Sequence, residues 1–139
     1  MCENKILLVR SLFGKREWSI PGGYVEANET VEQAVAREVS EETGVVAPLE
    51  GLIGVRHRVS AGDNSAYLIF LMRAETEQCR PDQTEVSEAK YFALNETNQL
   101  NCLNLLTRMV VEHVMDGHIK TLSFRSHPNF SRDEYALFL

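Results

Sequence analysis

With 139 residues, the chain has the length of one ordinary domain, and this length permits a hydrophobic core without disulfides or a structural metal. Its 14 Lys and Arg residues are outnumbered by 20 Asp and Glu residues. The resulting formal charge of -6 argues against broad electrostatic capture of nucleic acid or of an anionic membrane. Any phosphate-bearing ligand must therefore be met by local cations or by a bound metal.

The cysteines and the N-terminal segment indicate the compartment. Cys2, Cys79 and Cys102 are widely spaced and form no CxxC or Cys/His cluster. They predict neither a disulfide framework nor a zinc site, and a reduced cytoplasmic setting is expected. The apolar run at residues 6–9 is too short for a secretory signal or a membrane span, so neither secretion nor anchoring is expected.

The first half of the chain predicts a strand, an open loop and a helix. Residues 5–9 form a short aliphatic run that predicts a buried strand, and residues 18–26 (WSIPGGYVE) predict a bent backbone that is open to close approach. Apolar residues at spacings of three and four then predict a helix over residues 31–43. The ends of this helix are marked by a capping box and a terminating glycine, at Thr30, Gln33 and Gly44.

The second half predicts a hairpin, a further strand and a second helix. Residues 51–59 and 65–73 predict two strands joined by a turn, and the nearly continuous apolar run of 65–73 predicts a central strand covered on both faces. A polar loop at 79–88 precedes a short strand at 89–94, and a helix is expected over 100–116. The core positions predicted for this last segment are Cys102, Leu103, Leu106, Met109, Val110, His113 and Val114.

The chain predicts a single domain over residues 1–139. The tail at 117–139 has no clear period, although its aromatic residues argue against a free disordered segment. There is no internal repeat, low-complexity tract or linker. Strands interleaved with two helices predict an α/β domain whose helices pack against a sheet.

The helix at 31–43 gathers negative charge at its C-terminal end. Glu38, Glu41 and Glu42 share one face, and each like-charge pair costs about 0.2–0.5 kcal/mol. The helix dipole also disfavours carboxylates there. A bound cation would compensate both effects, and carboxylate oxygens without interleaved thiols or imidazoles favour Mg²⁺ or Mn²⁺. A solvated acidic face is the alternative reading of these three residues alone.

The wider segment narrows this choice. Gly23, Glu29 and the run Arg37–Val45 match G-x5-E-x7-R-E-U-x-E-E-x-G-U, with U aliphatic, at every specified position. This is the Nudix box, and the chain resembles the MutT-like Nudix hydrolase superfamily. The resemblance implies an α/β/α sandwich with a mixed sheet flanked by helices. One departure is that the family usually has a full first strand before the strand that here begins at Lys5, and this chain has only four residues there. The other is Asn28, which stands where many relatives have glycine but tolerates a left-handed backbone.

The resemblance implies Mg²⁺-dependent hydrolysis of a nucleoside diphosphate linked to another group, with Mn²⁺ as a second candidate metal. The implied metal ligands are Gly22, through its carbonyl oxygen, Glu38, Glu41 and Glu42. Arg37 and Glu29 are expected to form an ion pair that positions Glu38. A catalytic base or an extra metal ligand is expected from Glu41, from Glu38, or from a glutamate outside the box, where Glu85 is preferred to Glu88.

Substrate contacts are expected from the two strands after the box. Arg56 and Arg58 share one strand face and could meet the diphosphate or lie toward solvent, whereas His57 points the other way. Trp18, Phe13 and Tyr67 could stack a base or belong to the core. Residues 18–26, with Gly22 and Gly23, are called the glycine loop. A basic patch at Arg10, Lys15 and Arg16 lies near this loop in sequence, and its role is open.

The expected partner is a small nucleoside-diphosphate derivative, with no membrane and no nucleic acid. One alternative is a hydrolase that acts on the 5′ end of RNA, which would need a basic track beyond the pocket. Another is a catalytically silent Nudix scaffold that senses a nucleotide, which the complete set of box glutamates disfavours. A homodimer is a further hypothesis, because a shortened first strand would leave a sheet edge to be covered.

Overall fold

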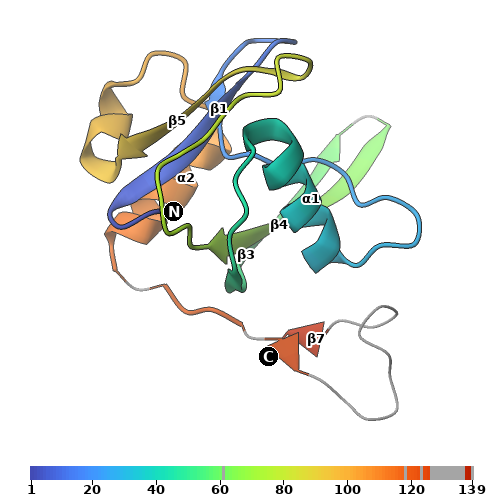
Figure 1. The fold of residues 1–139 in the computed structure, drawn as a ribbon. Helices are drawn as coiled ribbons and strands as arrows, with labels where there is room; N and C mark the ends of the chain where they lie inside the picture. The colour runs from blue at the N-terminus through green and yellow to red at the C-terminus, as the bar shows by residue number, and fades with distance from the viewer. Residues whose placement is uncertain (61, 118, 123, 126–136, 139) are drawn as a thin grey trace.

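The computed structural model describes residues 1–60, 62–117, 119–122, 124–125 and 137–138. Figure 1 shows the elements in chain order, and their bounds are β1 (Lys5–Ser11), β2 (Trp18–Ser19), α1 (Val31–Thr43), β3 (Leu49–Ser60), β4 (Asp63–Met72), β5 (Val86–Ala93), the 3₁₀ helix η1 (Leu94–Gln99), α2 (Leu105–Met115), β6 (Phe124–Arg125) and β7 (Leu137–Phe138).

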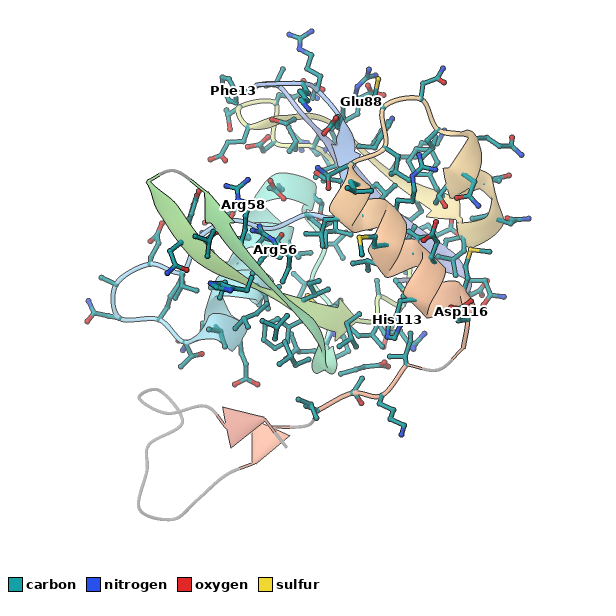
Figure 2. The ribbon with its side chains drawn as sticks, turned by 180° about the vertical axis from the view of Figure 1, so that it is seen from behind. Phe13, Arg56, Arg58, Glu88, His113 and Asp116 are labelled. Atoms are coloured by element: carbon teal, nitrogen blue, oxygen red, sulfur yellow. The ribbon has the colours of Figure 1, made fainter. Side chains whose placement is uncertain are left out.

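The strands form a three-stranded sheet in the order β2-β1-β5, a two-stranded β3-β4 sheet and a two-stranded β6-β7 sheet. All ladders between the strands of the described part are antiparallel. Figures 1 and 2 view the molecule from opposite sides, and α1 is nearer the viewer in the first while α2 is nearer in the second. Helices therefore lie on opposite sides of the strands, which confirms the α/β fold expected from the sequence.

Strand β1 separates two hydrophobic clusters. Consecutive residues of a strand point to opposite faces. Leu7 accordingly packs in a cluster with Val39 of α1, whereas Leu8 packs in a second cluster with Val111 of α2. Both leucines are buried. This alternation fixes α1 and its acidic end on one face of the β1 sheet.

Helix α1 has the bounds that the sequence predicts. The Thr30 hydroxyl accepts from the Gln33 N–H at 3.3 Å, and the Gln33 side chain accepts from the Thr30 N–H at 2.8 Å. Gly44 ends the helix with φ 68°, a left-handed conformation that glycine adopts without steric cost. Asn28 is also left-handed, with φ 67°, which agrees with the tolerance expected of asparagine.

The prediction that residues 65–73 form a central strand is wrong for the described part of the chain. There β4 has a ladder with β3 only, and at its end the Met1 amino group donates to the Met72 carbonyl at 2.6 Å while the Ala74 N–H donates to the Met1 carbonyl at 2.7 Å. Ile69 and Leu71 on one face of β4 and Met72 on the other are nevertheless buried. Burial of both strand faces explains the apolar run. An apolar run indicates that a strand is buried, but it does not indicate that the strand has a neighbour on each edge.

Two further boundaries differ from the sequence prediction. Strand β5 begins at Val86, inside the segment predicted as a loop, because this polar stretch pairs with the end of β1 at Ser11. Helix α2 begins at Leu105 instead of residue 100, because the Asn104 side chain caps it, accepting from the Leu106 N–H at 3.0 Å.

The predicted core face of α2 is partly wrong. The deeply buried positions are Thr107 and Val111, whereas Met109 and His113 are exposed. Cys102 is also exposed. The reason is a hydrogen bond that a hydrophobic pattern does not predict. The Thr107 hydroxyl accepts from the Ile20 N–H at 3.0 Å, and this bond turns the Thr107 face of α2 toward the glycine loop.

The tail contacts the fold at Leu122, which exchanges backbone hydrogen bonds with Leu52 at 2.9 and 3.1 Å. Gly51 makes this approach possible, because a Cβ there would lie 2.7 Å from the Leu122 carbonyl oxygen. The tail is expected not to be free. For residues 118, 123, 126–136 and 139 this expectation lies outside the part of the chain that the structure describes. Among the described residues, no helix is long and apolar enough to cross a membrane.

Candidate active site

The glycine loop lies against the acidic end of α1. The Gly22 N–H donates to the Glu42 carboxylate at 2.9 Å. Gly23 faces Glu38 so closely that a Cβ there would collide with the Glu38 carboxylate. Gly22 has φ 149°, and a Cβ on it would lie 2.8 Å from the Tyr67 hydroxyl oxygen. The two glycines are therefore required by the side chains that surround them, and the loop and the helix form one unit.

Arg37 joins this unit together. Its Nη2 and Nε donate to the two carboxylate oxygens of Glu29 at 2.8 and 3.1 Å, which is the ion pair expected from the sequence. Its Nη1 donates to Glu38 at 3.1 Å and to Glu41 at 3.0 Å, and its Nη2 also donates to the Tyr24 carbonyl at 3.0 Å. The forked guanidinium suits several oxygens at once. One side chain thus fixes the loop and three of the box glutamates.

The charges of the site act on one another. Burial raises the pKa of Glu42 to about 7, the Gly22 N–H opposes this rise, and the negative charges of Glu38, Glu85 and Asp82 add to it. By contrast, hydrogen bonds from Arg37 and from the Glu26 N–H lower the pKa of Glu29 to about 2. A carboxyl group that is desolvated among other carboxylates is stabilised in its ionised form by a nearby cation. Glu42 is such a group.

The loop before β5 brings Glu85 toward Glu42. Asp82 accepts hydrogen bonds from the N–H groups of Thr84, Glu85 and Val86 at 2.9–3.1 Å, and this turn holds Glu85 in place. Burial would raise the pKa of Asp82, but these hydrogen bonds and one from the Thr84 hydroxyl lower it to about 2. The Glu85 carbonyl also accepts from the Leu12 N–H at 2.8 Å.

Across from the acidic residues, the β3–β4 hairpin contributes arginines to a cleft of about 740 Å³. Arg56, Arg58 and Tyr67 line this cleft together with Gly22, Gly23 and Glu38. Figure 2 shows Arg56 and Arg58 on the same side of the hairpin, as the alternation of a strand predicts. The Arg56 guanidinium lies over the Tyr67 ring, 5.6 Å from its centroid. Its Nη1 is buried and has no hydrogen-bond partner among the described residues.

A family model described as "NUDIX domain" matches residues 1–113. The chain belongs to the Nudix hydrolase family. It is 35% identical over 116 residues to "Phosphatase NudJ" of Escherichia coli K12, a match that covers 81% of this chain and 74% of that protein.

Solved Nudix structures share the fold. A MutT Nudix hydrolase from Burkholderia pseudomallei is 27% identical with a TM-score of 0.70, and the match covers 81% of this chain and 95% of that chain. The Nudix domain of NrtR from Shewanella oneidensis, complexed with ADP ribose, has a TM-score of 0.71 at 24% identity, covering 81% of this chain and 77% of that chain. At that identity the second likeness concerns the fold alone.

Two aromatic residues singled out from the sequence of this Nudix hydrolase, Trp18 and Phe13, do not line the cleft. Trp18, predicted as a substrate contact, is instead buried in the core, where its ring meets that of Phe92 edge-on at 4.9 Å. Phe13 is exposed at the tip of the loop after β1, away from Arg56 and Arg58 (Figure 2). A large aromatic residue beside a sheet fills the core first, and this accounts for Trp18.

The other basic and polar candidates have local partners. Arg10 lies over the Trp18 ring at 5.9 Å and donates to Glu88 at 3.1 Å and to the Arg16 carbonyl at 3.0 Å. Glu88 is thus bound to Arg10, whereas Glu85 is the glutamate whose charge reaches Glu42. His57 is hydrogen-bonded to the Asn64 side chain at 2.7 Å, as expected for a histidine that is not a base.

The box carboxylates of this Nudix hydrolase are held apart from one another. No three His, Cys, Asp or Glu side chains of the described residues gather closely enough to form a preformed metal cage. Arg37 engages Glu38 and Glu41, and Glu41 is mostly exposed. The carboxylates of Glu42 and Glu38 nonetheless lie against Gly22 and Gly23, and the desolvated Glu42 would gain from a cation, so the oxygen ligands present fit a hard divalent ion.

Asp82 is the residue of the site that sequence reasoning missed. Its role is to build the turn that carries Glu85. The segment PDQT (residues 81–84) has the form of an aspartate turn, in which the carboxylate accepts from N–H groups two residues on, and this pattern could have identified it.

Proposed function

We propose that this Nudix hydrolase uses Mg²⁺ to hydrolyse the phosphoanhydride bond of a nucleoside diphosphate linked to another group. The observation that carries the proposal is the composition of the two walls of one cleft. Glu38 and the glycine loop form one wall, and Arg56 with its unpartnered buried nitrogen, within the described part of the chain, belongs to the other. A diphosphate with bound cations complements both walls, because its oxygens can accept from arginine while its metal binds carboxylate.

The metal would be held by Glu38, Glu42 and the Gly22 carbonyl oxygen, with Glu41 as a further ligand. When bound, Mg²⁺ would supply charge neutralisation of the diphosphate oxygens and a lowered pKa for water. The chain supplies the orientation: Arg37 holds Glu38 and Glu41, and the Gly22 N–H holds Glu42. Mn²⁺ has the same preference for oxygen ligands and could replace Mg²⁺.

Glu85 is the proposed base. Its carboxylate lies near enough for its charge to raise the pKa of Glu42, and Arg10 does not engage it as it engages Glu88. In this proposal a Glu85 carboxylate oxygen accepts the proton of the attacking water, the P–O–P linkage breaks and two phosphorylated products leave. Arg56 donates hydrogen bonds to the phosphate oxygens and holds the bound substrate in place.

The named relative from Escherichia coli supports a phosphorylated substrate. That protein, 35% identical to this chain over 116 residues, is called a phosphatase. An RNA 5′ end would need a basic track, and Arg10 of the expected basic patch is already bound to Glu88 and Trp18. The small-molecule substrate is therefore preferred to RNA.

The test is hydrolysis of a panel of nucleoside triphosphates, dinucleoside polyphosphates, ADP-ribose, NADH and nucleotide sugars with Mg²⁺, with products read by mass. One compound cleaved far faster than the others, and not cleaved after chelation of the metal, would support the proposal. No turnover of any compound by a folded protein that binds Mg²⁺ would contradict it and favour a capped RNA or a sensing role.

Glu42→Gln provides the blank for this panel. The substitution keeps the shape of the side chain and removes one charge from an acidic cluster, so the melting temperature should not fall. Activity should fall at least a hundredfold because a metal ligand is lost. Glu112→Gln, an exposed position on α2, is the matched control and should keep the parent rate. Parent activity in Glu42→Gln would contradict the site.

A further inference from the structure

Arg56 carries a donor that the fold buries and leaves unused. Its Nη1 has no acceptor in the part of the chain that the structure describes, although the side chain lines the cleft. Buried polar groups in native proteins are nearly always hydrogen-bonded, and an exception in a cleft calls for an acceptor from a ligand. For a guanidinium, that acceptor is an anionic oxygen.

The aromatic ring of Tyr67 supports this guanidinium. Arg56 and Tyr67 are direct partners across the β3–β4 ladder, and the guanidinium carbon lies 5.6 Å from the ring centroid. A cation at this distance is attracted to the ring face. The contact also reduces the rotamers available to a long side chain, which lowers the entropy lost when a ligand binds.

The other end of Tyr67 reaches the opposite wall. Its hydroxyl oxygen lies 2.8 Å from the position that a Cβ on Gly22 would take, so it packs directly on the loop whose N–H holds Glu42. Tyr67 thus touches both the arginine of the hairpin and the loop of the acidic wall. Among the described residues that line the cleft, no other side chain contacts both the Arg56 guanidinium and Gly22.

We propose that Tyr67 is a positioning residue that holds Arg56 at a fixed place relative to the Gly22 loop, so that Nη1 meets a phosphate oxygen of the substrate. This inference rests on the proposed function, because a diphosphate is the anion that Arg56 would meet. It replaces the expectation that Tyr67 stacks a base, since Arg56 covers its ring. Tyr67 acts through Arg56 and does not itself bind the phosphate.

The test is a double-mutant cycle with inorganic pyrophosphate as the probe, measured by calorimetry in the presence of Mg²⁺. Tyr67→Leu removes the ring and Arg56→Ala removes the cation, and each should weaken binding about tenfold. In the Arg56→Ala background, Tyr67→Leu should weaken binding less than about twofold. Tyr67→Phe keeps the ring under Arg56 but removes the hydroxyl that packs on the Gly22 loop, so it should weaken binding less than Tyr67→Leu does.

The same variants should raise KM more than they lower kcat for the substrate found in the panel. Arg73→Ala is the matched control, because Arg73 pairs with Glu50 on the exposed side of the hairpin and should leave binding unchanged. If Tyr67→Leu does not fold, Arg56→Lys serves instead: it keeps the charge, loses the planar group that stacks, and should weaken binding as Arg56→Ala does.

Equal weakening by Tyr67→Leu with and without Arg56 would overturn the inference, as would parental binding by Arg56→Lys. A parent protein that does not bind pyrophosphate would overturn it too. Coupled binding without hydrolysis of any panel compound would instead reject the proposed function and leave the inference standing, so the two failures are distinguishable.

Discussion

Gly23→Ala tests whether the carboxylate of Glu38 must lie where the structure places it. The Cβ of alanine would collide with the Glu38 carboxylate, whose Oε2 would be 2.7 Å away. Ordinary carbon contacts begin near 3.5 Å, so the carboxylate must move by about 1 Å. A displacement of about 1 Å in a catalytic group costs about a hundredfold in rate, which corresponds to about 2.7 kcal/mol of transition-state stabilisation.

The expected result is a hundredfold loss of kcat/KM with little change in the melting temperature. Gly23 does not have a positive φ, so alanine introduces no backbone strain, and its effect on unfolding should stay below about 1 kcal/mol. Gly54→Ala is the matched control, because a Cβ there would meet Ile69 at an ordinary 3.5 Å. A folded Gly23→Ala protein with kcat/KM within about threefold of the parent would refute the reasoning.

Three further outcomes are expected. Glu85→Gln should lower kcat at least about a hundredfold. Glu88→Gln loses only a pair with Arg10 and should keep the parent kcat. A larger loss of kcat in Glu88→Gln than in Glu85→Gln would reject Glu85 as the base. Arg37→Lys should lower kcat/KM about ten- to a hundredfold because lysine cannot hold several acceptors, with Arg73→Lys as a control that changes nothing; parental kcat/KM would show that the fork is dispensable. Light scattering should give the mass of two chains, because part of the β4 edge has no ladder partner in the described structure; a one-chain mass would reject the dimer.

The acidic helix was predictable because its signals are local. Capping residues, a terminating glycine and a 3.6-residue period lie within the helix itself, and α1 has the predicted bounds. Gly23 of the box also has a local cause, since the side chain that excludes a Cβ there is Glu38 of the same motif. The alternation of the hairpin likewise placed both arginines on one face.

What the sequence missed depends on contacts between distant segments. The start of β5 depends on pairing with β1, and the lack of a second partner for β4 in the described chain cannot be read from an apolar run. The choice between Glu85 and Glu88 depended on Arg10, which is more than seventy residues away from both. Trp18 could be a platform or a core residue until its contact with Phe92 was known.

The two walls of the cleft come from different parts of the fold, the acidic wall from the glycine loop and α1 and the arginine wall from the β3–β4 hairpin. Arg37 of the acidic wall is engaged by glutamates of that wall, whereas Arg56 belongs to the other wall, so a partly folded chain with intact α1 or an intact hairpin would have no complete site. During denaturation, binding of an anion should therefore disappear with the loss of packing between these parts, before the helical signal does. Ligand binding in this protein would then report on tertiary assembly, and substitutions deep in the cleft lining could abolish turnover without touching a charged residue.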